Sequence, residues 1–294
     1  MEPARDGPAD AALLVPGVGR DVAGAAGARH PLFGTKHDGP GSTEAATPLR
    51  IGAMAPLVYV CVRPQQGAAA AEYESFRTGS RLEPGELEQW DLVGEPLPDD
   101  AFERWRGFMV GGSPFNVTDP ESTKTDVQRR LEADLARIAE RAAAGETAAL
   151  FTCFGIGVVT RTLGGSVTRG YPEDTGPSIV TLTDAGRRDP LFGGLAPAFT
   201  VLTAHKEGSA TPPPGAMLLA TNDGCPVQAY RVGERLYATQ FHPEPTTHAF
   251  TERMAVYRDD GYFAATDYDR IAGQVLAASV TEPNRILRGF AHTF

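Results

Sequence analysis

The stretch from residue 149 to residue 159 reads Ala149-Leu150-Phe151-Thr152-Cys153-Phe154-Gly155-Ile156-Gly157-Val158-Val159. Apolar and β-prone residues lead into a cysteine, and two glycines follow before more apolar residues. This pattern predicts a buried strand that ends in a tight turn, followed at once by a helix. A side chain on such a turn is exposed at the end of the sheet, as in nucleophile elbows.

Cys153 is therefore a candidate nucleophile. The positive end of the following helix would favour the thiolate, which is the reactive form of the side chain. The alternative is that Cys153 is a small buried hydrophobic residue, as most free cysteines are. The stretch alone slightly favours this alternative, and a second stretch later in the chain reverses the preference.

The composition is that of an ordinary globular protein with an excess of acidic over basic residues. The 294 residues are 41% hydrophobic and carry a formal net charge of −10, which is enough chain for one large domain or two small ones. No basic block stands out, so we expect no nucleic-acid partner. No apolar run approaches the length of a membrane span, and the early Ala-Ala-Leu-Leu-Val-Pro stretch is too short for a convincing signal peptide.

The three cysteines indicate a reducing environment. Cys61, Cys153 and Cys225 are widely spaced and odd in number, so they do not form a disulfide framework. Because there is no CxxC pattern and no Cys/His cluster, we expect no structural zinc, no other metal and no cofactor. The simplest interpretation is a soluble cytoplasmic protein. Cys61 is expected in the core, and Cys225 lies in an Asp-Gly-Cys-Pro turn without a catalytic signal.

The chain is expected to form one folded domain after an N-terminal extension. Residues 1–54 are rich in Ala, Gly, Pro and Asp and lack a sustained hydrophobic period, which predicts a disordered extension. Residues 55–294 are expected to form the folded domain, beginning with a buried parallel strand at 57–62. Residues from about 247 to 294 are expected to form a mostly helical tail.

Strands and helices alternate in the first half of this domain. A helix is expected at 68–76, a second strand at 91–93, and a short helix that begins at 98–100. Residues 107–114 predict a strand and a Gly-rich loop, whose backbone amides can approach a ligand closely. The best helix is expected to begin at Asp119-Pro120 and to end at Gly145, and it leads into the Cys153 strand.

The second half predicts further strands and completes the fold class. These strands are expected at 167–183, 199–203, 217–221, 227–231 and 235–241. The order predicts an α/β fold with a mostly parallel twisted sheet, flanking helices and an antiparallel insertion after the Cys153 turn.

The second informative stretch is Gln240-Phe241-His242-Pro243-Glu244. A thiol nucleophile needs a base within hydrogen-bond reach, and that base needs a partner to orient it. His242 and Glu244 are two residues apart at the end of an expected strand, and Pro243 restrains the backbone between them. Cysteine, histidine and acid form a triad through their roles and geometry, not their order in the chain.

These motifs resemble those of the class I glutamine amidotransferases. Residues 240–244 resemble the family's QFHPE signature, and Thr152–Gly155 resembles its nucleophile elbow, usually G-x-C-x-G-x-Q. Residues 112–117 resemble its oxyanion loop. Further stretches resemble stand-alone amidotransferases related to the GMP synthase glutaminase domain: 163–165, 189–192 and 204–207. The resemblance covers roughly residues 57–250 in the family's order, and four motifs in order are specific together. It implies a flavodoxin-like architecture.

The resemblance also implies a mechanism. Cys153 would attack the side-chain amide of glutamine and form a γ-glutamyl thioester, while backbone amides near Gly112, Ser113 and Phe154 hold the oxyanion. His242 would protonate the departing ammonia and then activate water, and Glu244 would orient the His242 ring and favour its charged form. Ammonia would pass to an acceptor or a partner synthetase. A further residue, His205, could support the site or be a satisfied surface histidine.

Two positions depart from the family pattern. Phe151 stands where the pattern has glycine, and Gly157 stands where it has glutamine. Neither belongs to the expected triad, but both bear on how glutamine would be bound. Two alternatives therefore remain open: an amidohydrolase that acts on another γ-glutamyl amide, and a non-catalytic regulatory relative.

Overall fold

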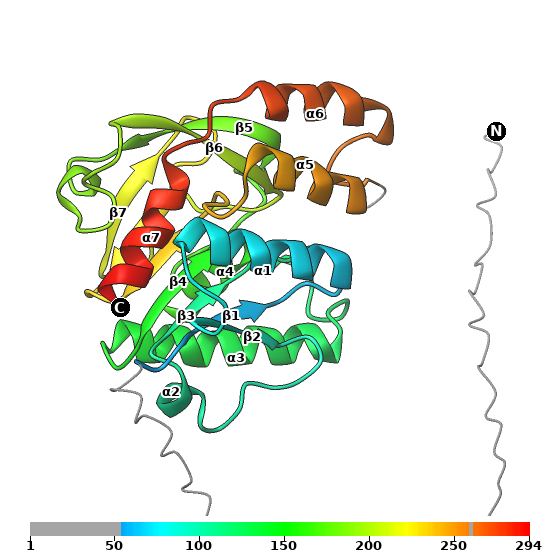
Figure 1. Cartoon of the computed structure of the whole chain (residues 1–294). Coiled ribbons are helices and arrows are strands. Elements are labelled where there is room, and N and C mark those ends of the chain that lie inside the picture. The colour runs from blue at the N-terminus through cyan, green and yellow to red at the C-terminus, as the bar shows by residue number, and fades with distance from the viewer. Residues whose placement is uncertain (1–53, 259–260) are drawn as a thin grey trace, which may run out of the picture. The chain divides into compact units, whose positions relative to one another are not determined.

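A nine-stranded sheet crosses the part of the chain that the computed structural model describes, residues 54–258 and 261–294 (Figure 1). The extension expected at 1–54 lies outside the described residues, apart from Met54. The strands are β1 (Leu57–Cys61), β2 (Leu87–Asp91), β3 (Gly107–Val110), β4 (Ala148–Thr152), β5 (Glu173–Leu182), β6 (Ala198–His205), β7 (Ala216–Thr221), β8 (Ala229–Val232) and β9 (Leu236–Thr239). The helices are α1 (Gln66–Ser80), α2 (Ala101–Arg104), α3 (Asp126–Ala143), α4 (Phe154–Thr162), α5 (Thr247–Val256), α6 (Tyr268–Ala277) and α7 (Pro283–Thr293).

The sheet has a parallel part and an antiparallel part. Its strand order is β2-β1-β3-β4-β9-β8-β7-β5-β6. The strands β2, β1, β3, β4 and β9 pair in parallel, whereas every pair from β9 to β6 is antiparallel. The expected α/β class, with a parallel core and an antiparallel insertion after the Cys153 turn, is confirmed.

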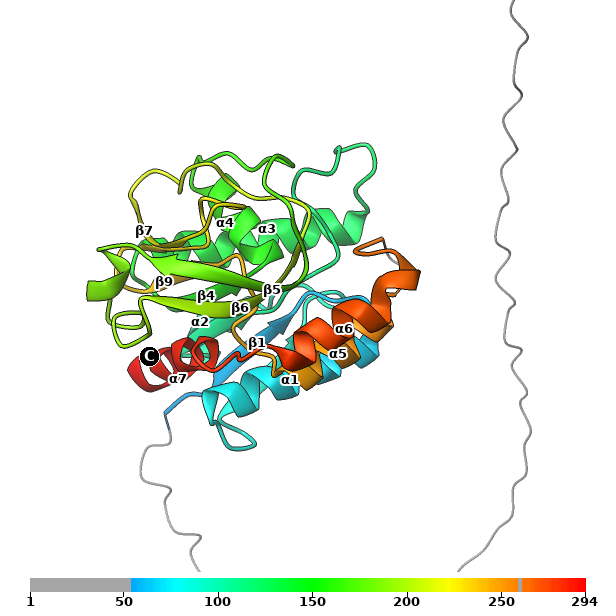
Figure 2. The ribbon, with the colours of Figure 1, turned by 90° about the horizontal axis from the view of Figure 1, so that it is seen from above.

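Helices cover both faces of the sheet, which explains the continuous apolar sequence of β1. Leu57 and Tyr59 contact the cluster that includes α1 and α7, while Val58 and Val60 contact the cluster that includes α3 and α4. Figure 2 shows α3 and α4 on one side of the sheet and α1, α5, α6 and α7 on the other. A strand buried on both faces has no polar side to alternate with.

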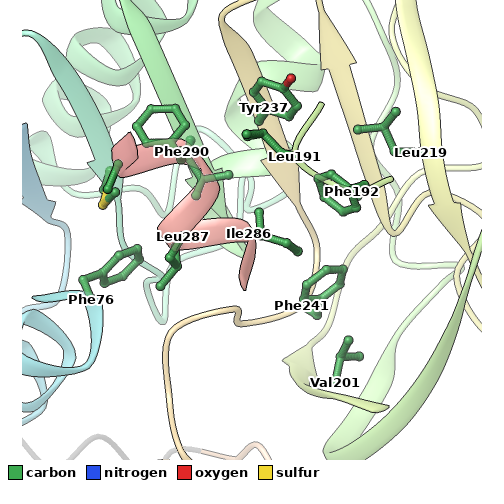
Figure 3. Packing of buried hydrophobic residues seen from close by; sticks show 14 of the residues in the cluster. Phe76, Leu191, Phe192, Val201, Leu219, Tyr237, Phe241, Ile286, Leu287 and Phe290 are labelled. Carbon is green, nitrogen blue, oxygen red and sulfur yellow. The ribbon is translucent and has the colours of Figure 1, made fainter. Parts of the chain in front are cut away.

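The C-terminal helices are part of the fold. Three apolar residues of α7, Ile286, Leu287 and Phe290, are fully buried in the cluster between α1 and the sheet (Figure 3). Apolar residues of α5 and α6 pack against Leu202 of β6: Phe250 and Met254 from α5, and Ile271 and Val275 from α6. The helical tail expected from about residue 247 is thus seen as three helices that cover the sheet. No helix among the described residues combines the length and apolarity needed to cross a membrane.

Several expected boundaries are wrong, and two of them have a clear local reason. The helix α3 begins at Asp126, not at Asp119-Pro120, because the Thr125 hydroxyl caps it by accepting from the Gln128 amide at 3.1 Å. The second strand spans Leu87–Asp91 and not 91–93, because a turn begins at Asp91, whose carboxylate accepts from the Val93 amide at 3.1 Å and whose carbonyl accepts from the Glu95 amide. The strand expected from residue 167 begins only at Glu173.

Candidate active site

The neighbouring parallel strands β3, β4 and β9 end at the same edge of the sheet, and the residues that follow them form the site. Val110 at the end of β3 is paired with Phe151 of β4, and Thr152 at the end of β4 is paired with Thr239 of β9. The residues that follow these ends therefore meet, although they are far apart in the chain. Ligand sites of open α/β sheets commonly lie at this carboxyl edge.

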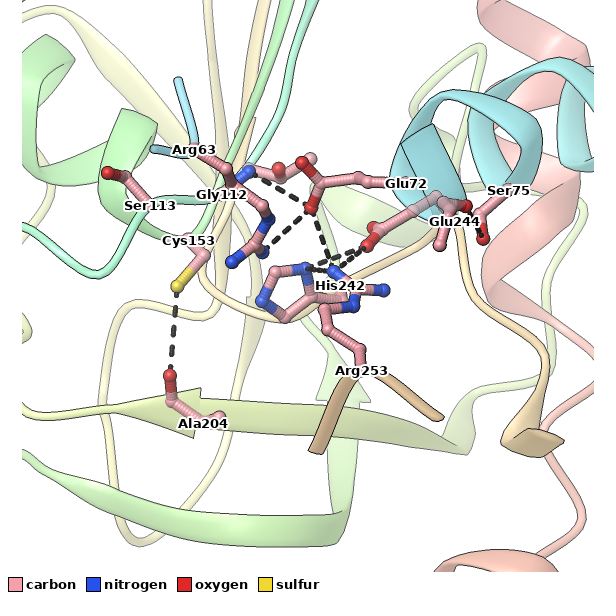
Figure 4. Close-up of polar contacts among 12 residues, drawn as sticks. Arg63, Glu72, Ser75, Gly112, Ser113, Cys153, Ala204, His242, Glu244 and Arg253 are labelled. Carbon is pink, nitrogen blue, oxygen red and sulfur yellow. Dashed lines mark hydrogen bonds and ion pairs between the residues drawn. The ribbon is translucent and has the colours of Figure 1, made fainter. Parts of the chain in front are cut away.

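Cys153 occupies a strained turn between β4 and α4. Its φ is 51° and its ψ is −107°, and among the described residues only one other non-glycine residue, Arg81, has a positive φ. Such backbone costs about 1–3 kcal/mol and persists where the surroundings fix it. Here the Cys153 amide donates to the Thr239 carbonyl of β9 at 2.8 Å. The Cys153 thiol lies near the Ala204 carbonyl, at 3.9 Å (Figure 4).

The structure shows what surrounds Phe151 and Gly157, the two positions that depart from the family pattern. Phe151 is fully buried, and a Cβ added at Gly155 would lie 3.0 Å from the Phe151 Cβ. Gly155 therefore makes room for the bulky residue under the turn. A Cβ added at Gly157 would lie 3.1 Å from Val117 and 3.2 Å from the Glu207 carboxylate. The space next to Gly157 is thus occupied by other side chains.

His242 and Glu244 follow β9 and form a buried pair. The His242 amide donates to the Leu202 carbonyl at 3.0 Å, and the His242 Nδ1 lies 2.9 Å from the Glu244 Oε1. Nδ1 is therefore committed to the carboxylate, which leaves Nε2 for a partner on the Cys153 side. Figure 4 shows the imidazole between Cys153 and Glu244.

The charges of this pair stabilise each other. Burial alone would lower the pKa of His242, but the Glu244 carboxylate and the neighbouring Cys153 thiol raise it to about 9. Burial alone would raise the pKa of Glu244, but the charges of His242 and Arg253 lower it to about 2. Near neutral pH the two groups therefore form an imidazolium–carboxylate ion pair.

A second buried carboxylate extends this ion pair into a network. Arg253 Nη1 donates to Glu244 Oε1 and to Glu72 Oε1, both at 2.8 Å. Arg63 Nη2 donates to the same Glu72 oxygen at 2.8 Å. Burial alone would raise the pKa of Glu72, but the two arginine charges outweigh it and lower the pKa. His242 is thus connected to α1 and to the loop after β1 through side-chain charges (Figure 4).

The Gly-rich loop after β3 lies against this network. The Gly112 amide donates to Glu72 Oε1 at 3.3 Å. A Cβ added at Gly112 would lie 2.6 Å from the His242 Cε1, so only glycine allows the loop to approach the imidazole so closely. Ser113 is buried next to Cys153, and its hydroxyl accepts from the Phe115 amide at 3.4 Å.

Two cavities meet at Cys153. The base-side cavity, about 420 Å³ with its open mouth, is lined by His242, Arg253, Phe250 and Met254 among others. The loop-side cavity, about 250 Å³ with its open mouth, is lined by Phe154, His205, Lys206, Glu207 and Gln240 among others. Cys153, Ser113, Ala204 and Tyr262 line both. The thiol therefore lies between two compartments of different chemistry, one mainly apolar and one polar.

His205 is buried at the end of β6 and is not a surface residue. Its Nδ1 lies 2.9 Å from the Glu207 carbonyl, and its Nε2 lies 2.8 Å from Glu173 Oε2. Glu173 also accepts from the side chains of Ser178, Asn222 and Gln228. Burial alone would raise the pKa of Glu173, but these hydrogen bonds lower it to about 2.

The surroundings of His205 bear on metal binding. Glu173, His205 and Cys225 offer ligand atoms within 4.8 Å of one another. However, four donors already fill the lone pairs of the Glu173 carboxylate, and burial raises the pKa of the Cys225 thiol to about 11. The cluster is better explained as a hydrogen-bond network that fixes the loop carrying Glu207. The second such group, Glu72, His242 and Glu244, is filled by the two arginines.

The sequence-predicted site residues meet at one edge of the sheet, and several unpredicted residues join them. Cys153, His242, Glu244, Gly112, Ser113, Phe154 and His205 all lie there. Arg63, Glu72 and Arg253 were not predicted, because nothing in their local sequence distinguishes them from surface charges. Glu207 belongs to a motif quoted above but was not assigned a role. It accepts from the Val117 and Thr118 amides at 2.9 and 3.0 Å and so fixes the end of the Gly-rich loop.

Comparison with known families agrees with this geometry. The family described as glutamine amidotransferase class-I matches residues 105–256, more than half of the chain. The chain belongs to this family of enzymes. Arg253 lies within the matched residues, whereas Arg63 and Glu72 precede them.

Curated relatives of this amidotransferase differ in what they do. A GMP synthase (glutamine-hydrolyzing) from Thermus thermophilus is 28% identical over 163 residues, which cover 54% of this chain and 29% of that protein. Gamma-glutamyl peptidase 3 from Arabidopsis thaliana is 28% identical over 170 residues, which cover 54% of this chain and 64% of that protein. The chain thus spans less than two thirds of either relative.

Solved structures support the fold. A glutamine amidotransferase from Thermotoga maritima matches with a TM-score of 0.64 at 16% identity, over 81% of this chain and 97% of that chain. A glutamine amidotransferase from Methylobacillus flagellatus matches with a TM-score of 0.59 at 17% identity, over 82% and 94%. These similarities concern the architecture alone.

Proposed function

We propose that this amidotransferase hydrolyses the side-chain amide of glutamine with Cys153 as the nucleophile, His242 as the base and Glu244 as the orienting acid. The observation that carries the proposal is the strained backbone of Cys153 beside a buried His242–Glu244 ion pair. A structural cysteine needs neither the unusual φ nor a buried histidine whose pKa is raised. Both features suit a thiol that must be presented and activated.

The reaction has two halves. The Cys153 thiolate attacks the γ-carbonyl carbon, the C–N bond breaks, and the proton on His242 Nε2 passes to the departing nitrogen. The products of this half are ammonia and a γ-glutamyl thioester. His242 then takes a proton from water, hydroxide attacks the thioester, and glutamate and the thiol are released.

The oxyanion is proposed to be held by backbone amides. The Phe154 amide is the first of α4 and has no acceptor within the helix, so it can donate to the oxyanion. The Ser113 amide is the second proposed donor. The Gly112 amide already donates to Glu72, so Gly112 acts by letting the loop approach His242. His205 acts by fixing the loop of the loop-side cavity, which would receive the γ-glutamyl group.

The ammonia is proposed to pass to an acceptor or to a synthetase partner. The GMP synthase relative carries the term glutamine-hydrolyzing in its name, and such a coupling is what the family resemblance predicts. A cytoplasmic location also stays a prediction.

The test is the release of glutamate and ammonia from glutamine by the purified protein, with Cys153→Ala as the comparison. We expect activity that is lost in the variant while circular dichroism and the unfolding midpoint stay unchanged. Equal activity in both proteins would overturn the assignment of Cys153. If neither protein is active, labelling of Cys153 by a glutamine-like electrophile at neutral pH would support a partner-dependent enzyme. Absence of labelling would favour a non-catalytic relative.

A further inference from the structure

The base-side cavity lies where the leaving nitrogen must depart. Because His242 protonates that nitrogen in the proposed reaction, the leaving group has to be on the His242 side of Cys153. The γ-glutamyl group then belongs to the polar cavity on the other side. The chemistry of the base-side cavity therefore determines which leaving group the site accepts on the γ-glutamyl substrate.

Ammonia does not account for the lining of this cavity. Phe250, Met254 and Phe263 present apolar side chains to it. It shares Thr175, Tyr262 and Phe263 with a groove of about 1640 Å³, again with its open mouth, between β5 and α6. The groove thus borders the base-side cavity, and the two together offer room for a leaving group larger than ammonia.

Polar atoms in the same lining lack partners. Arg63 Nε, Thr175 Oγ1 and Arg253 Nη2 are buried and have no hydrogen-bond partner among the described residues. All three residues line the base-side cavity. Buried polar atoms without a partner are rare in native proteins, and each one calls for an explanation. Here all three can donate, which suits a ligand that carries acceptor oxygens.

The cationic side chains of the site lie on this side of the thiol. Arg63 and Arg253 are paired with the buried carboxylates Glu72 and Glu244, and both arginines also line the base-side cavity. A carboxylate on the leaving group would therefore meet two guanidinium groups there.

We propose that the preferred substrate is a γ-glutamyl dipeptide whose second residue is apolar. This inference rests on the proposed function, since it assigns the leaving-group side of the same site. The apolar side chain would contact Phe250, Met254 and Phe263, and the carboxylate would accept from Arg63, Thr175 and Arg253. Cys153 attacks the γ-carbonyl carbon, the amide C–N bond breaks, and the His242 proton goes to the nitrogen. The free amino acid leaves, and water then releases glutamate from the thioester.

The test compares three substrates by glutamate release: γ-glutamyl-phenylalanine, γ-glutamyl-phenethylamide and glutamine. The first two differ only in the carboxylate, and glutamine lacks both the ring and the carboxylate. We expect kcat/KM for γ-glutamyl-phenylalanine to exceed that for phenethylamide by about 10-fold or more, since hydrogen bonds to a charged group are at stake. We expect glutamine to be the poorest substrate.

Two variants probe the two contacts separately. Met254→Trp fills the apolar lining and should lower the ratio of kcat/KM for γ-glutamyl-phenylalanine to that for glutamine by about 10-fold. Thr175→Val removes the hydroxyl without changing the shape, and should lower the preference for γ-glutamyl-phenylalanine over phenethylamide. Met217→Trp, at an exposed residue of β7, serves as the control and should change neither ratio.

The outcomes separate the two proposals. Cys153-dependent turnover in which glutamine is the best substrate would overturn the leaving-group assignment and leave the proposed function intact. The leaving-group assignment would also be overturned, with the proposed function intact, if neither variant lowers its kcat/KM ratio. For Thr175→Val this is the ratio of γ-glutamyl-phenylalanine to phenethylamide, and for Met254→Trp it is the ratio of γ-glutamyl-phenylalanine to glutamine. No Cys153-dependent release from any of the three substrates would overturn the proposed function, and the leaving-group assignment with it.

Discussion

The proposed nucleophile and the proposed base of this site are held in place by different physical means. Cys153 is fixed by backbone: its turn is strained, its amide is bound to β9, and Gly155 packs against Phe151 beneath it. His242 is fixed by charge, through Glu244, Arg253 and then Glu72. The Cys153 turn should therefore respond to changes of volume, whereas the His242 side should respond to changes of charge.

This division follows from where each residue lies. The elbow is the direct continuation of a core strand, so covalent geometry and packing define its position. The His242–Glu244 segment follows a short strand, β9, and its side chains are inserted between α1 and α5. Burying several charges there is stable only when each has a partner, because an unpaired buried charge costs several kcal/mol.

Glu244→Gln should have the largest effect on catalysis. The neutral amide cannot stabilise the imidazolium, so we expect kcat on the best substrate to fall by about 10³-fold to 10⁴-fold, as for orienting acids of other triads. Steady-state release of glutamate measures it. Glu74→Gln, a half-exposed residue of α1, is the matched control. A loss of less than about 10-fold would mean that Glu244 is not the orienting acid.

Arg253→Met should have the largest effect on stability. It leaves Glu72 and Glu244 facing each other without their shared cation, and we expect unfolding in urea to show a loss of about 3–5 kcal/mol. Arg270→Met, at an exposed residue of α6, should change stability little. Adding Glu72→Gln to Arg253→Met should restore part of the loss. If Arg253→Met is as stable as the wild type, charge does not hold the His242 side.

The ion pair of His242 should make stability depend on pH. Because its pKa is raised to about 9 in the folded protein, the native state holds this proton more tightly than the unfolded chain, whose histidine pKa is about 6.5. The contribution is fully present below about pH 6.5 and is lost as the pH rises through about 9, and it amounts to at most about 3 kcal/mol. The difference in unfolding free energy between the wild type and His242→Gln should therefore shrink from pH 6 to pH 10. A difference that is constant over this range would contradict the ion pair.

Gly155→Ala should have the smallest effect and should act through volume alone. The added Cβ would lie 3.0 Å from the Phe151 Cβ, and overpacking of this kind costs about 1–3 kcal/mol. We expect a lower unfolding midpoint and lower kcat, with an unchanged pH profile. Gly67→Ala, where an added Cβ meets nothing within 4 Å, is the control. A shifted pH profile in Gly155→Ala would show that the two sides of the site are not separable in this way.

The sequence by itself determined the parallel core, the position of the elbow and the identity of the expected triad residues. These follow from short-range signals: apolar runs such as 57–61, glycines after Cys153, and the spacing of His242 and Glu244 around a proline. Boundaries that depend on a local competitor were missed. The α3 start is the clearest case, because the Thr125 cap outcompetes the Asp119-Pro120 signal six residues earlier.

Only the tertiary structure decided which charges hold His242 and what lies on each side of the Cys153 thiol. Glu72, Arg63 and Arg253 come from three separate segments, and nothing in their own neighbourhoods distinguishes buried from exposed charges. They meet because α1 and α5 pack on the same face of the sheet beside the end of β9. The two cavities likewise exist only once β6, the α5–α6 segment and the elbow are assembled. Their contrast in polarity arises from contacts between distant residues, which a pattern along the chain does not record.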